Sequence, residues 1–289
     1  MRDRPPVSCD GDGDRDMSMN SEAYSVDEAK PSPGKSKKQS RLADIYATLF
    51  VVGLIFVGMQ VASGYVPPFI MPAPKVVLAS VVEILTQNYS HILITVVRII
   101  AGLAFAMVVG VLLGLIMGTV PKLKPFVRAM VIIDTGIPAL SWMLLAVFWF
   151  REPEARIFFI LSVILIPFYA LNVHEGIRAM QKDLVDMIES FRPSKWHMFK
   201  YLLWPWIVPY IFMTTKSIIG FAIRMAIFAE LLGAAIGVGA QMGMAQATFR
   251  IDQVLAWTVL LVILNLSAQA LVQAIEKLMF KWRPEVEVR

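Results

Sequence analysis

The chain has 289 residues, of which 57% are hydrophobic and only 17% are charged, and its mean hydropathy is +0.64. Soluble domains carry about 25% charged residues, so this composition excludes a soluble globular protein and indicates a membrane protein. The net charge of +5 falls mostly in short loops, where it reflects membrane topology rather than nucleic-acid binding. The single cysteine, Cys9, excludes an intrachain disulfide.

The N-terminal segment, residues 1–41, mixes Asp, Gly, Ser, Pro and Lys with few large apolar side chains. It cannot bury enough apolar surface to fold alone, so it is predicted to be a disordered cytoplasmic tail, with a regulatory or docking role as the alternative. It contains no long apolar run, so no cleaved signal peptide is expected at the start. Residues 42–283 are predicted to form the transmembrane domain, and residues 284–289 a cytoplasmic C-terminal end.

Six apolar runs follow the tail, each close to the roughly twenty residues that cross a hydrocarbon core about 30 Å thick. Membrane-spanning β-strands would be shorter and would alternate in polarity, so an all-α, polytopic membrane protein with about six transmembrane helices is predicted. The runs cover approximately Ile45–Ala62, Ile92–Met117, Phe126–Trp149, Ile157–Val173, Ile207–Leu232 and Val254–Ile275.

Lysine and arginine alternate between rich and poor loops along the chain. The segments before the first run, between the second and third, between the fourth and fifth, and after the sixth are rich in these residues, and the other three are poor. Basic loops are retained on the cytoplasmic side, so both termini are predicted to be cytoplasmic.

Two features concern how the helices pack. Small residues spaced by four in the second run predict close contact with another helix, the alternative being a gap that lines a pore; they are Gly102, Ala106, Gly110, Gly114 and Gly118. Later runs contain residues that interrupt helices, which indicates either helices facing the bundle interior or ordinary kinks; they are Gly136, Pro138, Pro167, Pro205 and Pro209.

No pattern in the chain predicts catalysis. There is no glycine-rich phosphate loop followed by Lys and Ser or Thr, so the chain is not expected to hydrolyse ATP itself. His91, His174 and His197 share no metal-ligand spacing, and no serine or cysteine nucleophile lies in a strained glycine turn. We therefore expect no catalytic, cofactor or metal site.

Ionisable residues within apolar runs are costly and are therefore candidates for function. Lys216 and Arg224 lie about two helical turns apart and can project toward one interior sector, with Glu230 six residues further on. These three are predicted to line a substrate pathway or gate, or else to pair with one another. The other candidates are Arg98, Arg128 and Asp134; Arg98, Arg128 and Glu230 lie near run ends, where snorkelling is the alternative.

The loop between the fourth and fifth runs, residues 178–203, is too polar to span a membrane and has two helical apolar stripes. Two short amphipathic helices in a cytoplasmic loop suggest a docking surface for a partner, the alternative being an element lying on the lipid surface. The first stripe consists of Leu184, Ile188 and Phe191, and the second of Trp196, Phe199 and Leu203, with Pro193 between them.

The segment Asp183–Pro209 resembles the cytoplasmic coupling loop of binding-protein-dependent ABC permeases. Asp186, Met187 and Ile188 stand at its Glu-Ala-Ala start, Arg192 at its glycine, and Trp204-Pro205 at its Leu-Pro pair. Further segments resemble other motifs of the family in the same order, and the pattern is most similar to permeases for nitrate, taurine and alkanesulfonates. These segments are Met71–Val77, Thr95–Gly118, Ile137–Phe150 and Ala229–Gly239, within a match from Met71 to Trp282.

This resemblance implies a type I importer permease in a bacterial inner membrane, carrying a small, anionic solute. Its implied partners are ABC ATPase subunits that bind the ATP, a periplasmic or lipid-anchored solute-binding protein, and a second permease copy, identical or not. The residues implied in ATPase coupling are Leu184, Asp186, Ile188, Phe191, Arg192 and Pro193. An ion-coupled secondary transporter is the alternative; it needs intramembrane carboxylates and an inverted repeat, and the sequence offers only Asp134 and Glu230 and no evident repeat.

Three residues depart from the family pattern: Arg192 and Arg151 replace glycines, and Thr214 stands where glycine is usual. Arg192 precedes Pro193, and a residue before proline is biased toward extended backbone. We therefore expect Arg192 to be extended rather than to make the left-handed turn that glycine permits.

Overall fold

The computed structural model describes residues 37–67 and 70–279. The predicted C-terminal end, residues 284–289, and residues 1–36 of the predicted tail lie outside this range. Helix α1 begins at Lys37, so the last five residues of the segment predicted to be a disordered tail are helical. The predicted end of the tail at residue 41 is therefore too late in the chain. A helix can extend beyond its apolar run into the basic residues that flank it.

All regular structure in the described residues is helical. The α-helices are α1 (Lys37–Tyr65), α2 (Pro74–Gln87), α3 (Tyr89–Thr119), α4 (Lys124–Gly136), α5 (Ala139–Trp149), α6 (Pro153–Arg178), α7 (Lys182–Glu189), α8 (Lys195–Met198), α9 (Trp204–Leu231), α10 (Val238–Ala247) and α11 (Ile251–Met279), and a π-helix, η1 (Phe199–Leu203), lies between α8 and α9. The chain divides into two units, Met1–Gly53 and Leu54–Arg289. The described part of the first unit is the N-terminal part of α1, and all the other helices belong to the second.

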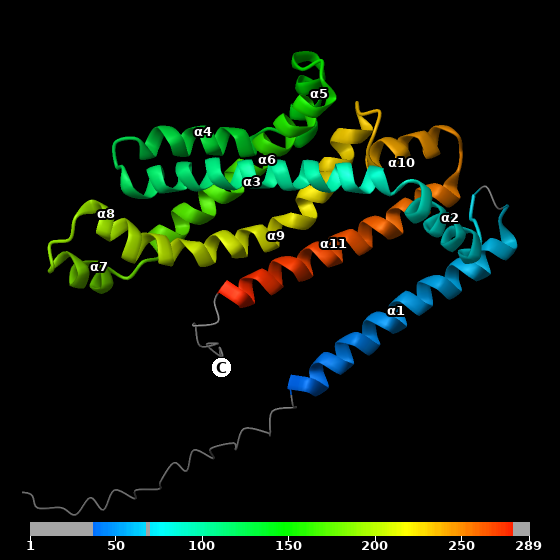
Figure 1. Cartoon of the computed structure of the whole chain (residues 1–289), viewed down its shortest axis with the longest axis horizontal. Helices are drawn as coiled ribbons and strands as arrows, with labels where there is room; N and C mark the ends of the chain where they lie inside the picture. The colour runs from blue at the N-terminus through cyan, green and yellow to red at the C-terminus, as the bar shows by residue number, and fades with distance from the viewer. Residues whose placement is uncertain (1–36, 68–69, 280–289) are drawn as a thin grey trace, which may run out of the picture. The chain divides into compact units, whose positions relative to one another are not determined.

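The centre of the second unit is a bundle in which α6 packs between α3 and α9 (Figure 1). Its core is apolar and comes from α3, α5, α6 and α9, with Leu161, Leu165 and Tyr169 of α6 fully buried. A second apolar cluster joins α2 and α10 to α11 around the buried Trp257. Helices α9, α10 and α11 lie side by side where the two clusters meet. A cavity forms between these three helices.

The small-residue stripe of α3 faces α6. A Cβ atom added at Gly110 would lie 2.5 Å from Tyr169 Cβ, and one added at Gly114 would lie 2.7 Å from Val173 Cβ. Contacts this short leave no room for a side chain, so the backbones of the two helices approach closely at these glycines. Ala106, one position earlier in the stripe than Gly110, is fully buried.

Four single helices are long and apolar enough to cross a membrane, and a bent pair raises the number to five. They contain the second, fourth, fifth and sixth predicted runs, and the pair contains the third. The first run lies in α1, where the apolar helix found among the described residues, Phe50–Tyr65, is shorter than a span. The described residues thus provide four or five of the six predicted spans.

The third predicted run is not one straight helix. It forms α4 and α5, which meet at an angle of 94°. Helix α4 ends at Gly136, and Pro138, with an extended backbone, immediately precedes α5. Proline has no N–H to donate, so the helical hydrogen bonds of α4 cannot continue through it. The two residues therefore break this run, as a broken span or a re-entrant segment.

The other three prolines do not break their helices. Pro167 lies buried inside α6, and Pro209 lies inside α9. Pro205 follows the π-helix η1, whose wider turn lets the Trp204 N–H donate to the Phe199 carbonyl. The segment from Lys195 to Leu231 therefore runs as one helical span, so the second short helix predicted in the loop is the beginning of this span rather than a separate element.

Candidate functional site

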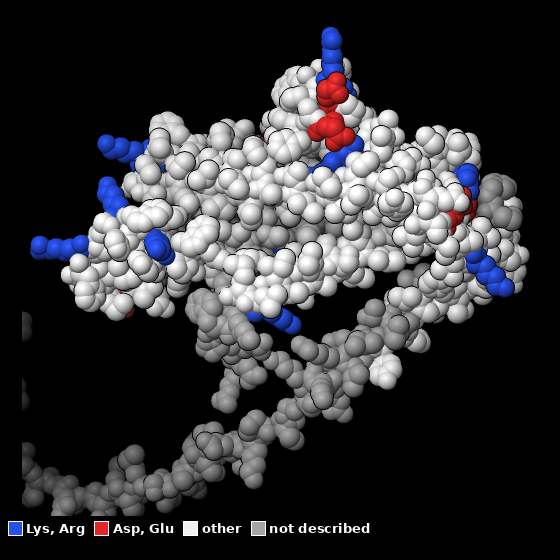
Figure 2. Space-filling model, in the orientation of Figure 1, with Lys and Arg blue, Asp and Glu red and all other residues white. Residues whose placement is uncertain are grey.

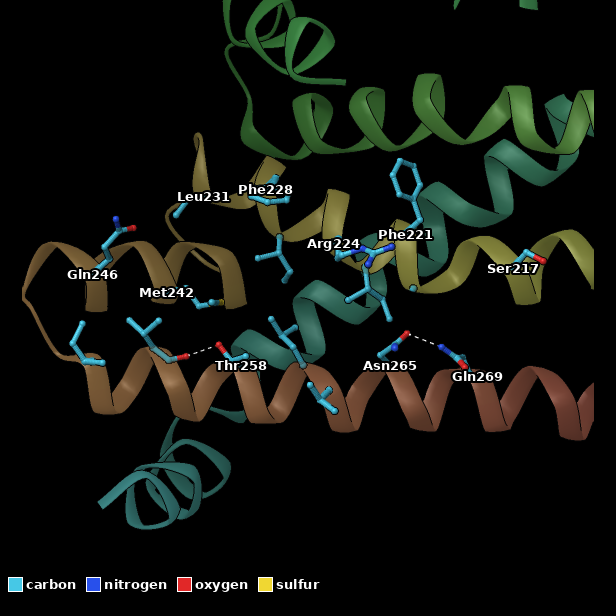
Figure 3. A pocket seen from close by; sticks show the side chains of 17 residues that line it. Ser217, Phe221, Arg224, Phe228, Leu231, Met242, Gln246, Thr258, Asn265 and Gln269 are labelled. Atoms are coloured by element: carbon cyan, nitrogen blue, oxygen red, sulfur yellow. Dashed lines mark hydrogen bonds between the residues drawn. The ribbon is translucent and has the colours of Figure 1, made fainter. Parts of the chain in front are cut away.

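A cavity of about 720 Å³ lies between α9, α10 and α11 (Figure 3). Arg224 of α9 is the one charged side chain among the described residues that line it. Ser217, Arg224, Asn265 and Gln269 lie toward one end, whereas Phe228, Leu231 and Met242 lie toward the other. The remaining polar lining side chains, Thr258 and Gln246, lie on the side of Met242.

The polar end of this cavity is held by neighbouring backbone and side chains. Gln269 Nε2 donates a hydrogen bond of 3.2 Å to Asn265 Oδ1, one turn earlier on α11. Gly220 lets Asn265 come close to α9, since a Cβ atom there would lie 3.0 Å from Asn265 Oδ1. This fixes the Asn265 amide opposite the segment of α9 that carries Arg224.

The three charges predicted to share a pathway lie in three different environments. Arg224 lines the cavity, but Lys216 pairs with Glu276 of α11, with its Nζ atom 3.6 Å from Glu276 Oε2. Glu230 is fully buried and does not line the cavity. The structure therefore brings only Arg224 to the cavity wall, because Lys216 and Glu230 point from α9 toward other helices.

Glu230 is the centre of a buried polar network. Its carboxylate accepts hydrogen bonds from Thr95 Oγ1 at 2.8 and 3.0 Å, from Arg98 Nη1 at 2.7 Å and from the Gly239 N–H at 2.9 Å. A buried carboxylate is stable only when it is paired and hydrogen-bonded in this way. Glu230 therefore joins α9 to α3 and to the start of α10, and neither snorkelling nor a place on an open pathway describes it.

Arg98 extends the network to α6. Its Nε donates to Glu154 Oε2 at 2.8 Å, its Nη2 also contacts Glu154, and its Nη1 donates to the Ile236 carbonyl at 2.7 Å. Arg98 is buried, so the snorkelling alternative is wrong for it, whereas the Glu154 side chain is 66% exposed. The Arg98 guanidinium on α3 thus binds three other parts of the chain: the start of α6, the end of α9 and the turn that precedes α10.

Side chains on one face of α3 accept hydrogen bonds from the turn before α10. The Gly237 N–H donates to His91 Nδ1 at 3.1 Å and the Val238 N–H to Thr95 Oγ1 at 3.0 Å. Gly237 has a φ of +132°, which L side chains rarely adopt, and a Cβ there would lie 2.5 Å from the Glu230 carboxyl carbon. Glycine is therefore required both by the backbone conformation and by the buried carboxylate.

The helix α7 of the loop is exposed on a different apolar face from the one predicted. Leu184 and Ile188 are half-buried, while Met187 and Phe191 are 55% and 82% exposed and Asp186 is exposed. Met187 lies in the last turn of α7, and Phe191 lies in the turn that follows the helix. The predicted face of Leu184, Ile188 and Phe191 is thus divided: only Phe191 presents a freely accessible apolar surface.

Arg192 adopts the conformation that its position before Pro193 was expected to prevent. Its φ is +47°, in the left-handed region, and its N–H donates to the Glu189 carbonyl at 2.8 Å. The expectation of an extended Arg192 is therefore wrong. The carbonyls at the end of α7 need donors, and the left-handed turn supplies them even where arginine replaces glycine.

Positive charge gathers at the end of the second unit that carries α7 and α8, where Figure 2 shows mostly lysine and arginine side chains. The loop between α5 and α6 instead displays acidic side chains beside basic ones. Among the described residues, no group of three His, Cys, Asp or Glu side chains could hold a metal ion. The apolar spans together define a multi-pass membrane protein, and the cavity between three of its helices offers a place for a solute.

Residues 106–281, more than half of the chain, match the family model described as the inner membrane component of binding-protein-dependent transport systems. The chain belongs to this family, whose members include ABC transporter permeases. The family places the chain among membrane components rather than among the catalytic subunits of such transporters. The family resemblance noted in the sequence, including the type I permease fold, is confirmed.

Relatives of this family align with half to three quarters of the chain at low identity. The chain is 23% identical to the taurine transport system permease protein TauC of Escherichia coli over 77% of its own length and 83% of that protein. It is 22% identical to the putative aliphatic sulfonates transport permease protein SsuC of Bacillus subtilis, over 78% and 82%. The nitrate import permease protein NrtB of Synechocystis is 27% identical, over 49% and 52%.

Solved structures share the fold. A chain of an amino acid ABC transporter with histidines aligns with a TM-score of 0.59 and 13% identity, over 69% of this protein and 97% of that chain. A chain of the inward-facing MetNI methionine ABC transporter aligns with a TM-score of 0.55 and 16% identity, over 67% and 98%. At these identities the likeness concerns the fold alone.

Proposed function

We propose that the chain is the permease subunit of an ATP-driven importer for a small anionic solute. The observation that carries the proposal is Arg224, the one charged side chain among the described residues lining the 720 Å³ cavity. A guanidinium beside the Asn265 amide attracts an anion and repels a cation. The relatives named for taurine, sulfonates and nitrate support an anionic solute for this chain.

The partners of such a permease are separate subunits. ABC ATPases bind and hydrolyse the ATP, a periplasmic or lipid-anchored binding protein delivers the solute, and a second permease copy, identical or not, completes the pathway. The described part of the chain offers no metal cluster, and no cofactor of its own is proposed. The end of the second unit that bears α7 and α8 is positively charged, and we infer from this charge that it lies on the cytoplasmic side. We infer from the alternation of basic loops that both termini are cytoplasmic as well.

Helix α7 is proposed to contact the ATPase. Phe191 and Met187 supply exposed apolar anchors, and Asp186 beside them supplies a charge that a basic group on the ATPase can meet. The left-handed turn at Arg192 and the following Pro193 end the helix and fix its direction. Leu184 and Ile188 are half-buried and are proposed to maintain the orientation of α7.

The Asp variants of α7 test this contact. Phe191→Asp is expected to reduce substrate-stimulated ATP hydrolysis by the assembled transporter at least tenfold, because it places an unpaired charge in an apolar contact. Ile188→Asp is expected to have the same effect. Membrane insertion of both variants should be normal, and the measurement is ATPase activity of the complex in lipid.

Two variants serve as controls for this prediction. Phe249→Asp makes the same substitution at another exposed phenylalanine, in the turn between α10 and α11, and Lys200→Ala removes a charge nearer the membrane. Both should keep most of the stimulated activity. Wild-type activity in the Phe191 and Ile188 variants would show that α7 is not the coupling element.

Arg224→Gln is expected to lower ATP-dependent uptake of the anionic solute at least tenfold, since it removes a charge-assisted hydrogen bond worth about 1.5–3 kcal/mol. The variant should still insert and bind the ATPase. Lys216→Gln is the matched control, because Lys216 lies on the same helix but outside the cavity lining. Uptake should be measured in cells expressing the complete transporter, and equal loss in both variants would contradict a specific role for Arg224.

A further inference from the structure

The cavity at Arg224 is larger and less polar than a site for an inorganic anion requires. Its volume of about 720 Å³ lies in the range of roughly 300–1,000 Å³ that holds organic ligands of drug size. Most lining side chains are apolar, and they include Phe228, Leu231 and Met242 at the end away from Arg224. A small ion such as nitrate would contact only the polar end.

The polar end provides donors for one anionic group. Asn265 Oδ1 already accepts from Gln269, so the Asn265 Nδ2 group is left to donate. Ser217 donates its proton to the Met213 carbonyl of its own helix at 2.9 Å, so it does not add a donor. The Arg224 guanidinium and the Asn265 amide thus form a two-residue site for the oxygen atoms of a carboxylate or sulfonate.

The described lining of the cavity has no negatively charged side chain that could pair with a cationic group on the ligand. No aspartate or glutamate is present among its described lining residues. The nearest carboxylate along α9, that of Glu230, is fully buried and used by Thr95, Arg98 and Gly239. An ammonium group in the cavity would find no counter-charge and would lie near the Arg224 guanidinium, which disfavours zwitterions.

We propose that this cavity binds an organic monoanion with an apolar body, such as a medium-chain alkanesulfonate or carboxylate, in preference to nitrate or to a zwitterionic sulfonate such as taurine. The anionic group contacts Arg224 and Asn265, and the apolar body lies along Phe228, Leu231 and Met242. This inference rests on the proposed importer function and specifies the chemistry of its solute.

Equilibrium binding to the purified full-length protein in lipid nanodiscs tests the proposal. Hexane-1-sulfonate is expected to bind saturably, and affinity should rise about fourfold for each methylene from propane- to hexane-1-sulfonate, which is the effect of burying about 0.8 kcal/mol per CH₂. Nitrate, taurine and hexyltrimethylammonium should not compete with it. Calorimetric titration provides the affinities.

Variants connect the binding to the cavity. Arg224→Gln should weaken hexane-1-sulfonate binding at least tenfold, Arg224→Lys should retain part of the affinity, and Lys216→Gln should leave it unchanged. Stronger binding of nitrate or taurine, the absence of a chain-length dependence, or unaltered binding by a monodisperse Arg224→Gln protein would each overturn the proposal. Failure to detect hexane-1-sulfonate binding by monodisperse wild-type protein would overturn it as well.

The same solutes separate this inference from the importer function. ATP-dependent uptake of nitrate or taurine by the complete transporter, with no uptake of hexane-1-sulfonate, would retain the importer and reject the solute class. Uptake of hexane-1-sulfonate that needs no ATPase would retain the solute class and reject the importer function.

Discussion

Replacing Gly110 by leucine is expected to prevent the protein from folding. A Cβ atom at this position would lie 2.5 Å from Tyr169 Cβ and 2.7 Å from the Ile166 carbonyl oxygen, and the backbone oxygen cannot move without shifting α6. The full leucine side chain would separate α3 from α6, where Leu161, Leu165 and Tyr169 are fully buried. Overpacking and the loss of this interface together should cost more than about 4 kcal/mol.

Size-exclusion profiles and melting temperatures in detergent measure this effect. Gly110→Ala should fold but with lower stability, by about 1–3 kcal/mol, because it adds only the clashing Cβ atom. Gly58→Leu is the control, since a Cβ atom at Gly58 has no described neighbour within 4 Å. A Gly110→Leu protein with a wild-type profile and melting temperature would show that the close α3–α6 contact is not required.

Arg98→Met and Glu230→Leu are each expected to lower the free energy of unfolding by about 3–5 kcal/mol. Removing Arg98 leaves the fully buried Glu230 carboxylate without its cation, and removing Glu230 leaves the Thr95 hydroxyl and the Gly239 N–H without their acceptor. The double variant leaves no unpaired charge at the site of Glu230. It should therefore cost clearly less than the sum of the two single variants.

A double-mutant cycle from denaturation in lipid–detergent micelles gives the coupling energy. The pair Lys216 and Glu276 provides the matched control, because its side chains are 44% and 34% exposed and a partly exposed pair contributes about 1 kcal/mol or less. Additive effects at Arg98 and Glu230, or equal losses at the control pair, would contradict a buried structural role for the network.

Apolar run length carried most of the information about the helices. Five of the six predicted runs correspond to helices or to the bent pair that can cross a membrane, because a helix satisfies its backbone hydrogen bonds within its own segment in lipid. The 94° bend was not predictable from the run itself. Gly136 and Pro138 allow a break, but the direction of the chain after it depends on how α5 packs on α6.

The buried network was missed as a unit. Arg98 and Glu230 were both noted as charges in apolar runs, yet they are 132 residues apart in the chain, and Glu154 lies on a third helix. A usable signal was the spacing of His91, Thr95 and Arg98, which places three polar side chains on one face of α3. Their partners could be identified only once α3, α6 and α9 were brought together.

The loop shows the same limit on a smaller scale. Helical periodicity predicted an amphipathic α7, but it grouped Phe191 with Leu184 and Ile188, which the fold leaves half-buried. Proline preferences predicted an extended Arg192, whereas the end of α7 imposes the left-handed conformation. In both cases neighbouring structure decided between conformations that the local sequence permits.

The most direct test of the account is solute uptake by the complete transporter in proteoliposomes. We predict uptake that requires ATP and the ATPase subunits on the side of α7, persists when a protonophore abolishes the proton gradient, and is lost in the Phe191→Asp variant. Uptake by the permease alone that needs no ATP and is abolished by the protonophore would contradict the account and favour an ion-coupled transporter.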